Sequence, residues 1–262
     1  QKPIEQTAHE ELKNMDTPEL VRNIKAFFKG EVLSDDKTLK LYSHDTSLFE
    51  VIPKLVLFPL DTEDLSGLVK FVSGNKASNP RLSITPRSGG TDMSGGSIND
   101  SIIVDFSKHF NEVGEIRKDG TVVQPGTFYR DFEKLTLAQG LLMPSYPASK
   151  NICAIGGMIA NNAGGEKTLA HGKTIDYVKS LKMILSDGKE YQFKEITLKE
   201  LQGKLKQQDF EGKIYERIFK LIEENYELIK ESKPKVSKNS TGLNIWDVWD
   251  RDKKVFDLTK LF

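Results

Sequence analysis

PRSGGTDMSGGS, residues 86–97, is the stretch that decides the fold, and a second glycine-rich stretch, IGGMIANNAGG, follows at residues 155–165. Glycine lacks a Cβ atom and reaches positive φ, so a ligand can approach its backbone closely. Successive N–H groups in such turns converge on an anion. Either stretch alone is equally well explained as a tight surface turn. Both together, flanked by strands and apolar residues, predict two backbone cradles that hold a diphosphate from opposite sides.

The segments around the first glycine stretch have a β-α-β pattern. Residues 54–59 and 101–106 are short, apolar and strand-like, and the strand predicted at 82–86 runs directly into the glycines. Apolar residues recur at helical spacing over residues 65–72, between the strands predicted at 54–59 and 82–86. The sequence therefore predicts a β-α-β unit with a glycine-rich turn after its second strand.

Two regions outside this unit also carry clear patterns. Alternating apolar residues on either side of the Asp-Gly pair at 187–188 predict an antiparallel hairpin. An apolar stripe over residues 20–28, closed by Gly30, predicts a helix near the N-terminus. Residues 1–50 are therefore expected to form a helical N-terminal extension.

Composition excludes several classes of function. Lys plus Arg and Asp plus Glu each number 38, so the net charge is zero and no basic excess exists to hold a nucleic acid. The single cysteine, Cys153, excludes an internal disulfide framework and a cysteine-built zinc site, and no metal site is predicted. No apolar run reaches the roughly 18–20 residues that cross a bilayer. A cytoplasmic location is expected, because one cysteine fits a reducing compartment.

Two common phosphate-binding motifs do not fit this sequence. A Rossmann dinucleotide site needs G-x-G-x-x-G directly after a strand, and that pattern is absent. A P-loop needs G-x-x-x-x-G-K-[ST], for which Gly172-Lys173-Thr174 supplies the end. Residue 167, where the first glycine of a P-loop belongs, is lysine. The spacing therefore rejects both motifs.

The two glycine stretches belong to a longer ordered series of motifs. The series is Tyr42-Ser43-x-Asp45-x-Ser47, Phe58-Pro59, residues 86–97, Gln124-Pro125-Gly126, Pro144-x-x-Pro147-Ala148-Ser149, residues 155–165, Gly172-Lys173-Thr174-x-Asp176 and Lys238-Asn239-Ser240-Thr241-Gly242-x-Asn244. It resembles the FAD-binding domain of the vanillyl-alcohol oxidase / p-cresol methylhydroxylase (PCMH) superfamily, and most of all its glycolate oxidase and D-lactate dehydrogenase branch. The likeness runs from about Tyr42 to Phe262.

The resemblance implies an α+β fold of the PCMH type, in which two subdomains hold FAD between them. The first FAD-binding subdomain would cover residues 51–112. The second would cover residues 113–262 and would be incomplete at its C-terminus. The helical extension, residues 1–50, would precede both.

The resemblance also implies which residues bind FAD. The first loop would hold the diphosphate through backbone N–H groups, and the second stretch would bind it from the other subdomain, alongside the ribityl chain and adenosine. Residues 144–149 would lie beside the isoalloxazine and the ribityl chain. The implied cofactor-binding residues are Pro86, Arg87, Ser88, Gly89, Gly90, Thr91, Asp92, Ser97, Pro144, Ala148, Ser149, Gly156, Gly157, Asn161, Asn162 and Gly164.

The resemblance implies non-covalent FAD. Many relatives tether the flavin through a histidine in the first glycine loop, and this loop contains no histidine. Some relatives add a cysteinyl link near the second glycine pair, but Cys153 lies one position away and is expected to be a small buried thiol. His171, where relatives often carry an aromatic residue, is expected to be an ordinary packed or surface histidine.

In relatives, a further segment completes the FAD domain after the stretch that matches residues 257–262, and a cap domain follows. That cap domain carries most substrate contacts and typically the catalytic base. The resemblance therefore implies the FAD-binding portion of a flavin-dependent oxidoreductase that acts on a small 2-hydroxy acid of the D-lactate or glycolate type and is inactive alone. No catalytic residue is assigned, and the substrate would bind through the missing cap domain. A partner subunit or an iron–sulfur electron acceptor is possible.

Two alternatives stay open at this point. The first is another flavoenzyme on the same scaffold, similar to an ether-lipid synthase or an aldonolactone oxidase. The second is a non-catalytic flavin-binding subunit. The intact glycine loops argue mildly against a degenerate domain, and cap sequence would separate the enzymes.

Overall fold

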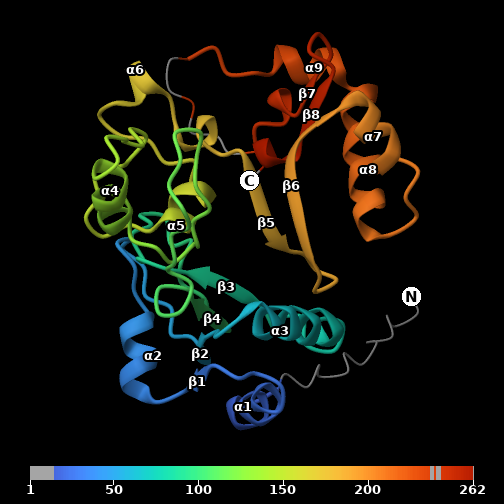
Figure 1. Ribbon diagram of the computed structural model, residues 1–262. Helices are drawn as coiled ribbons and strands as arrows, with labels where there is room; N and C mark the ends of the chain where they lie inside the picture. The colour runs from blue at the N-terminus through green and yellow to red at the C-terminus, as the bar shows by residue number, and fades with distance from the viewer. Residues whose placement is uncertain (1–14, 237–238, 240–242, 262) are drawn as a thin grey trace, which may run out of the picture.

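The computed structural model describes residues 15–236, 239 and 243–261 of the 262-residue chain. Within these residues the chain folds into two lobes, each built on a four-stranded sheet (Figure 1). The predicted α+β class is confirmed. The predicted boundaries at residues 50 and 112 stay a proposal. The described segment before residue 50 shares a sheet and a core with the first lobe.

The first sheet is mainly parallel. Its spatial order is β1 (Glu31–Leu33), β2 (Leu55–Phe58), β4 (Ile102–Asp105) and β3 (Ile84–Arg87). Strands β2, β4 and β3 run parallel, whereas β1 is antiparallel to β2. Helix α3 (Thr62–Asn75) connects β2 to β3, so the predicted β-α-β unit is confirmed.

The core of the first lobe lies between this sheet and two helices. Leu55, Leu57 and Ile102 of the sheet are fully buried. They pack in one cluster with Leu68 of α3 and with Leu20 of helix α1 (Thr17–Lys25). Removing such side chains from water supplies most of the stability of a sheet face.

The N-terminal segment contains more than the predicted helices. Helices α1 and α2 (Asp36–Tyr42) lie in the segment expected to be helical, but β1 lies between them and joins the first sheet. A strand of three residues is too short to show a periodicity of its own, and it forms because its backbone pairs with β2. The segment is therefore part of the first lobe. Residues 1–14 lie outside the described part of the chain.

The second sheet is antiparallel. Strands β5 (Ser180–Ile184) and β6 (Glu190–Thr197) form the predicted hairpin, with the turn at Gly188, whose φ is +72°. Strands β8 (Val255–Asp257) and β7 (Trp249–Asp250) continue the sheet beyond β6. The fully buried aromatic core of this lobe comes from β6, helix α8 (Phe210–Glu224) and β8: Phe193, Tyr215 and Phe256.

Helices cover the second lobe and link the two lobes. Figure 1 shows α7 and α8 on one side of β6, and α4, α5 and α6 on the other side of the molecule. The remaining bounds are α4 Tyr129–Leu137, α5 Ile155–Ala160, α6 Thr168–His171, η1 Thr174–Asp176, α7 Leu198–Lys204, α8 Phe210–Glu224, α9 Tyr226–Glu231, η2 Ile245–Asp247 and η3 Leu258–Leu261.

The tip of the second-lobe hairpin rests on helix α3 of the first lobe (Figure 1). The Ser73 hydroxyl donates a hydrogen bond to the Ser186 carbonyl at 2.7 Å, and the Ser66 hydroxyl donates to the Gly188 carbonyl. These bonds fix one side of the junction between the lobes. Among the described residues, no helix is long and apolar enough to span a membrane.

Candidate functional site

The first glycine stretch forms a loop at the carboxyl end of β3. Gly90 and Gly95 have φ of +61° and +88°, where an L side chain is strained. Within the described part of the chain, the backbone N–H groups of residues 89–91 have no hydrogen-bond acceptor. Because buried backbone donors are normally paired, a run of donors without a protein acceptor in this half-buried part of the loop marks a place where a ligand can supply the acceptors.

Asp92 organises the second half of this loop. Its carboxylate accepts hydrogen bonds from the Ser94 N–H at 3.0 Å, the Ser94 hydroxyl at 2.8 Å and the Gly96 N–H at 2.6 Å. Burial opposes ionisation, but these bonds and one from the Asn161 side chain outweigh it, so the pKa of Asp92 lies below its usual value. The Asp92 carboxylate thus accepts hydrogen bonds from the second half of its own loop and none from the N–H groups of residues 89–91.

The second glycine stretch opens with helix α5. The N–H groups of Ile155 and Gly156 donate to the carbonyls of Thr127 at 2.9 Å and Pro125 at 2.8 Å. The next N–H group, that of Gly157, has no acceptor among the described residues. The first turn of a helix leaves such donors open to capping groups or ligands. One donor of the second lobe is therefore available.

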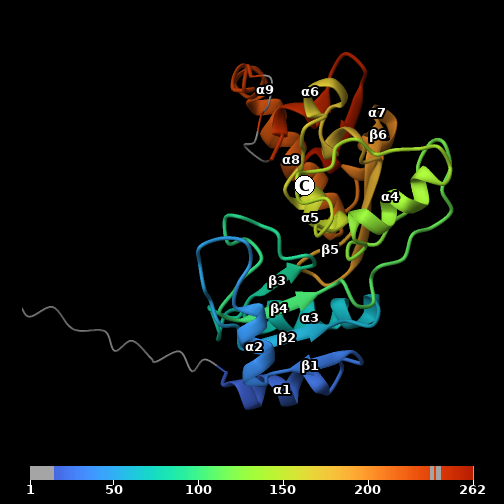
Figure 2. The same cartoon turned by 90° about the vertical axis from the view of Figure 1, so that its left-hand side faces the viewer.

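The two glycine stretches meet at the junction of the lobes. Figures 1 and 2 both place α5 beside the arrowhead of β3. A Cβ atom built on Gly89 would lie 2.3 Å from the Ile152 carbonyl oxygen, so the loop backbone touches the turn before α5. A Cβ atom built on Gly157 would lie 3.8 Å from the Ser88 hydroxyl. The structure therefore brings together the two segments that the sequence analysis paired.

The glycines of the second stretch have different reasons to be glycine. A Cβ atom on Gly156 would lie 2.6 Å from the Pro125 ring, and one on Gly165 would lie 2.2 Å from the Tyr146 carbonyl oxygen. The fold itself excludes a side chain at these positions. Gly157 has room for one, since its nearest neighbour in the structure is at ordinary contact distance. A cradle with space and an open N–H group fits a diphosphate oxygen.

Several other predicted cofactor residues have structural roles. Asn162 has φ of +44°, and its side-chain oxygen accepts the Ile175 N–H at 3.0 Å. Gly164 packs against Thr168, whose hydroxyl would lie 2.5 Å from an added Cβ atom. Ser97 is buried and donates to an Asp45 carboxylate oxygen at 3.1 Å. These residues shape the junction, and their contact with a cofactor stays a prediction.

The remaining predicted residues differ in exposure. Pro86 and Ala148 are exposed, whereas Pro144 is buried. The Ser149 carbonyl accepts two N–H groups of the following turn at 2.9 Å, which orients the chain toward α5. His171 is exposed, in agreement with its prediction as an ordinary histidine.

A polar pair beside the loop, formed by the half-buried Tyr42 and the buried Asp105, was not predicted from the sequence. The Tyr42 hydroxyl donates to the Asp105 carboxylate at 2.8 Å, and Asp105 also accepts the Ser107 N–H at 2.7 Å. Burial and then the Asp105 charge raise the pKa of Tyr42. Asp105 is the last residue of an otherwise apolar strand. A carboxylate at the carboxyl end of a parallel strand is the feature of the sequence that could have indicated a polar site here.

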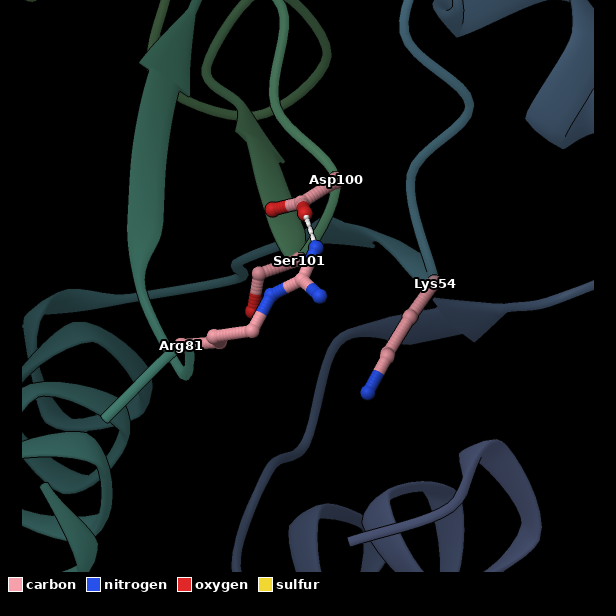
Figure 3. A pocket seen from close by; sticks show the side chains of 4 residues that line it. All are labelled: Lys54, Arg81, Asp100 and Ser101. Carbon is pink, nitrogen blue, oxygen red and sulfur yellow. Dashed lines mark hydrogen bonds and ion pairs between the residues drawn. The ribbon is translucent and has the colours of Figure 1, made fainter. Parts of the chain in front are cut away.

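A cavity of about 120 Å³ lies at the end of the first sheet that is opposite the glycine loop (Figure 3). Lys54, Arg81, Asp100 and Ser101 line it, where the parallel strands begin. Arg81 forms an ion pair with Asp100, and the Lys54 ammonium donates to the Met15 carbonyl at 3.2 Å. Its cations already have partners, and ligands of α/β sheets bind at the carboxyl ends of strands. The glycine junction is therefore the better candidate.

Solved structures show the class of fold. Alkyldihydroxyacetonephosphate synthase matches with a TM-score of 0.57 and 22% identity, covering 69% of this chain and 38% of that one. 6-Hydroxy-D-nicotine oxidase from Arthrobacter nicotinovorans matches with a TM-score of 0.55 and 22% identity, covering 64% and 36%. This is the PCMH-type FAD-binding architecture that the sequence predicted.

The family follows from the sequence match. Residues 53–194 match the family model described as an FAD binding domain, so the chain belongs to this family and FAD is its cofactor. The predicted superfamily is thereby confirmed.

Curated relatives share this region. D-2-hydroxyglutarate dehydrogenase of Pantoea ananatis is 31% identical over 236 residues, 89% of this chain and 23% of the relative. Glycolate oxidase subunit GlcD of Bacillus subtilis is 34% identical over 152 residues, 56% of this chain and 31% of the relative. D-lactate dehydrogenase of Anaerostipes hadrus is 28% identical over 180 residues, which cover 67% of this chain and 37% of the relative. The chain thus spans less than half the length of these relatives.

Proposed function

We propose that this chain is the FAD-binding portion of a flavin-dependent oxidoreductase that acts on a small 2-hydroxy acid. The observation that carries the proposal is the junction at which the N–H groups of residues 89–91 and of Gly157, which have no acceptor in the part of the chain that the structure describes, come from different lobes. Two lobes that each present backbone dipoles can hold a diphosphate without many lysines. The names of the relatives support the substrate class, because glycolate, D-lactate and D-2-hydroxyglutarate all carry a 2-hydroxy acid group.

In this proposal the chain binds and orients FAD, which would supply the acceptor for the hydride equivalent of the substrate. The loop of residues 88–91 and Gly157 hold the diphosphate. Asp92 keeps the loop in shape through Ser94 and Gly96. No residue of this chain is assigned as the catalytic base, so we expect little or no turnover by the chain alone.

FAD is proposed to bind without a covalent bond. The first glycine loop has no histidine for attachment. Cys153 is 4% exposed, and burial raises the pKa of its thiol, so the reactive thiolate is disfavoured. A denatured sample should therefore release all of its FAD into the supernatant, and flavin that stays with the precipitated protein would contradict this.

The proposal extends to partners and location. The word "subunit" in the name of the GlcD relative supports a partner subunit that contributes the substrate contacts. An iron–sulfur acceptor and a cytoplasmic location belong to the same proposal, and the single cysteine supports the latter.

Titration of the purified chain with FAD tests the proposal. We expect saturable quenching of flavin fluorescence at one FAD per chain. Addition of D-lactate, glycolate or D-2-hydroxyglutarate should leave the bound flavin oxidised, because this chain carries no assigned base. Absence of FAD uptake would contradict the proposed function, and rapid flavin reduction would contradict the absence of a base.

A further inference from the structure

Arg87 lies inside the first glycine loop. Its NH1 group points at the carbonyl of Ser97, 3.3 Å away, and at that of Tyr42, 3.4 Å away. A Cβ atom on Gly90 would lie 2.5 Å from NH2 of the same guanidinium. One side chain thus touches both the tight turn of the loop and its far end.

The aromatic ring of Tyr42 holds this guanidinium from another side. The guanidinium carbon lies 5.1 Å from the centre of that ring, within the range of a cation–π contact. The Tyr42 hydroxyl is in turn bound to Asp105, and Arg87 and Asp105 are paired residues of neighbouring strands. The position of the charge is therefore set by the first sheet.

The charges around the loop are unbalanced. Three carboxylates lie in or beside it, those of Asp45, Asp92 and Asp105. Arg87 forms no ion pair within 4.0 Å among the described residues, although Asp45 and Asp105 act on it at longer range. Burial lowers the pKa of Arg87, and the charges of Asp105 and Asp45 act in the opposite direction. A bound diphosphate would be repelled by the carboxylates and attracted by Arg87.

We propose that Arg87 is the positioning residue whose charge, held against the Gly90 backbone by Tyr42, lets the loop select a flavin that carries a diphosphate. The inference rests on the proposed function, FAD binding at this loop. It assigns the selectivity to one cation behind the loop, in addition to the backbone donors of residues 89–91.

The experiment compares Arg87→Lys, which keeps the charge, with Arg87→Gln, which keeps hydrogen-bond donors and loses the charge. The affinities for FAD and for riboflavin, which lacks the diphosphate, are measured by fluorescence titration, and thermal unfolding without flavin controls for folding. Only the FAD affinity should depend on the charge of residue 87. We expect Arg87→Gln to weaken FAD binding by about tenfold or more, the scale of a lost charge interaction in a half-buried site. Arg87→Lys should stay within about threefold of the wild type, although lysine lacks the guanidinium fork.

Equal losses in the Lys and Gln variants would overturn the proposal, because the fork and not the charge would then matter. Unchanged binding by Arg87→Gln would also overturn it. If wild-type protein binds no FAD, the proposed function fails first, so the two failures are distinguishable.

A second pair of variants covers the case in which Arg87→Gln does not fold. Tyr42→Leu removes the ring that holds the guanidinium, whereas Tyr42→Phe keeps the ring and removes only the hydroxyl. We expect weaker FAD binding in Tyr42→Leu and near wild-type binding in Tyr42→Phe. Equal affinities in the two variants would contradict the proposed role of the ring.

Discussion

The two glycine stretches reach the same junction by different means. The first, residues 86–97, is a loop with positive φ at two glycines, and it contains consecutive N–H donors that have no acceptor among residues 15–236, 239 and 243–261. The second, residues 155–165, packs tightly, because added Cβ atoms at Gly156 and Gly165 would meet neighbouring residues at 2.6 and 2.2 Å. The first stretch is thus shaped to present its backbone, whereas Gly156 and Gly165 of the second let segments within the second lobe approach each other.

This difference matters for assigning function to glycines. In the second stretch only Gly157 combines open space with an unpaired N–H group among the described residues. A glycine required by the fold and a glycine required by a ligand look the same in a sequence. Their substitutions should separate them, because one affects stability and the other affects binding.

The largest effect, a loss of stability, is expected at a glycine that the fold itself requires. Gly165→Ala places a Cβ atom 2.2 Å from the Tyr146 carbonyl oxygen, a contact with rigid backbone. We expect a loss of about 2–3 kcal/mol in the free energy of unfolding, as in overpacked cores. Urea unfolding measures it. Gly74→Ala, where no atom lies within 4 Å, is the matched control and should be neutral or stabilising. Equal stability of the two variants would contradict the assignment.

An intermediate effect, on FAD affinity, is expected at Gly157, the glycine proposed to contact the cofactor. Gly157→Ala meets only the Ser88 hydroxyl at 3.8 Å, so the free protein should keep its stability. The added methyl group fills the cradle, and we expect FAD affinity to fall by about tenfold, equivalent to roughly 1.4 kcal/mol. Fluorescence titration measures it, with Gly203→Ala as the control, since that glycine also has open space. Wild-type affinity in Gly157→Ala would remove Gly157 from the site.

The smallest effect is a pH dependence of the first loop. The pKa of Asp92 is lowered in the folded protein, so its contribution to stability is present at neutral pH and is lost as the pH falls through that pKa. The stability advantage of wild type over Asp92→Asn should therefore be full at pH 7 and shrink below about pH 4. Urea unfolding at several pH values checks this. An advantage that grows on acidification would contradict the sign.

Asp119→Asn serves as the control for this pH series. Asp119 lies in an exposed turn and approaches Lys179 only at 3.8 Å. Surface ion pairs of this kind contribute little, so the Asp119 variant should track the wild type across the series.

Local patterns predicted the elements that depend on neighbours in sequence. The glycine loop after a strand, the β5–β6 hairpin and the β-α-β unit all followed from spacing and turn chemistry. Strand β1 did not, because three residues have no periodicity and gain their pairing only from β2.

The details of the site depend on contacts between distant residues, which a pattern does not contain. The sequence could not show that the Asn162 side chain accepts a hydrogen bond from the Ile175 N–H group. It also could not show that a side chain has room at Gly157, whereas Pro125 occupies that space at Gly156. Nor could it show that Tyr42 meets Asp105, 63 positions away. The motif predicted which segments meet, and the structure was needed to separate their roles. Lys238 and residues 240–242 of the last motif lie outside the described residues.

Amide hydrogen exchange with and without FAD shows whether both glycine stretches contact the cofactor. We expect slower exchange on FAD binding in two separate peptides, one covering residues 88–91 and one covering residues 155–158. The hairpin at residues 180–197 should change little. Protection confined to one of the two glycine stretches, or to neither, would contradict a cradle shared by both lobes.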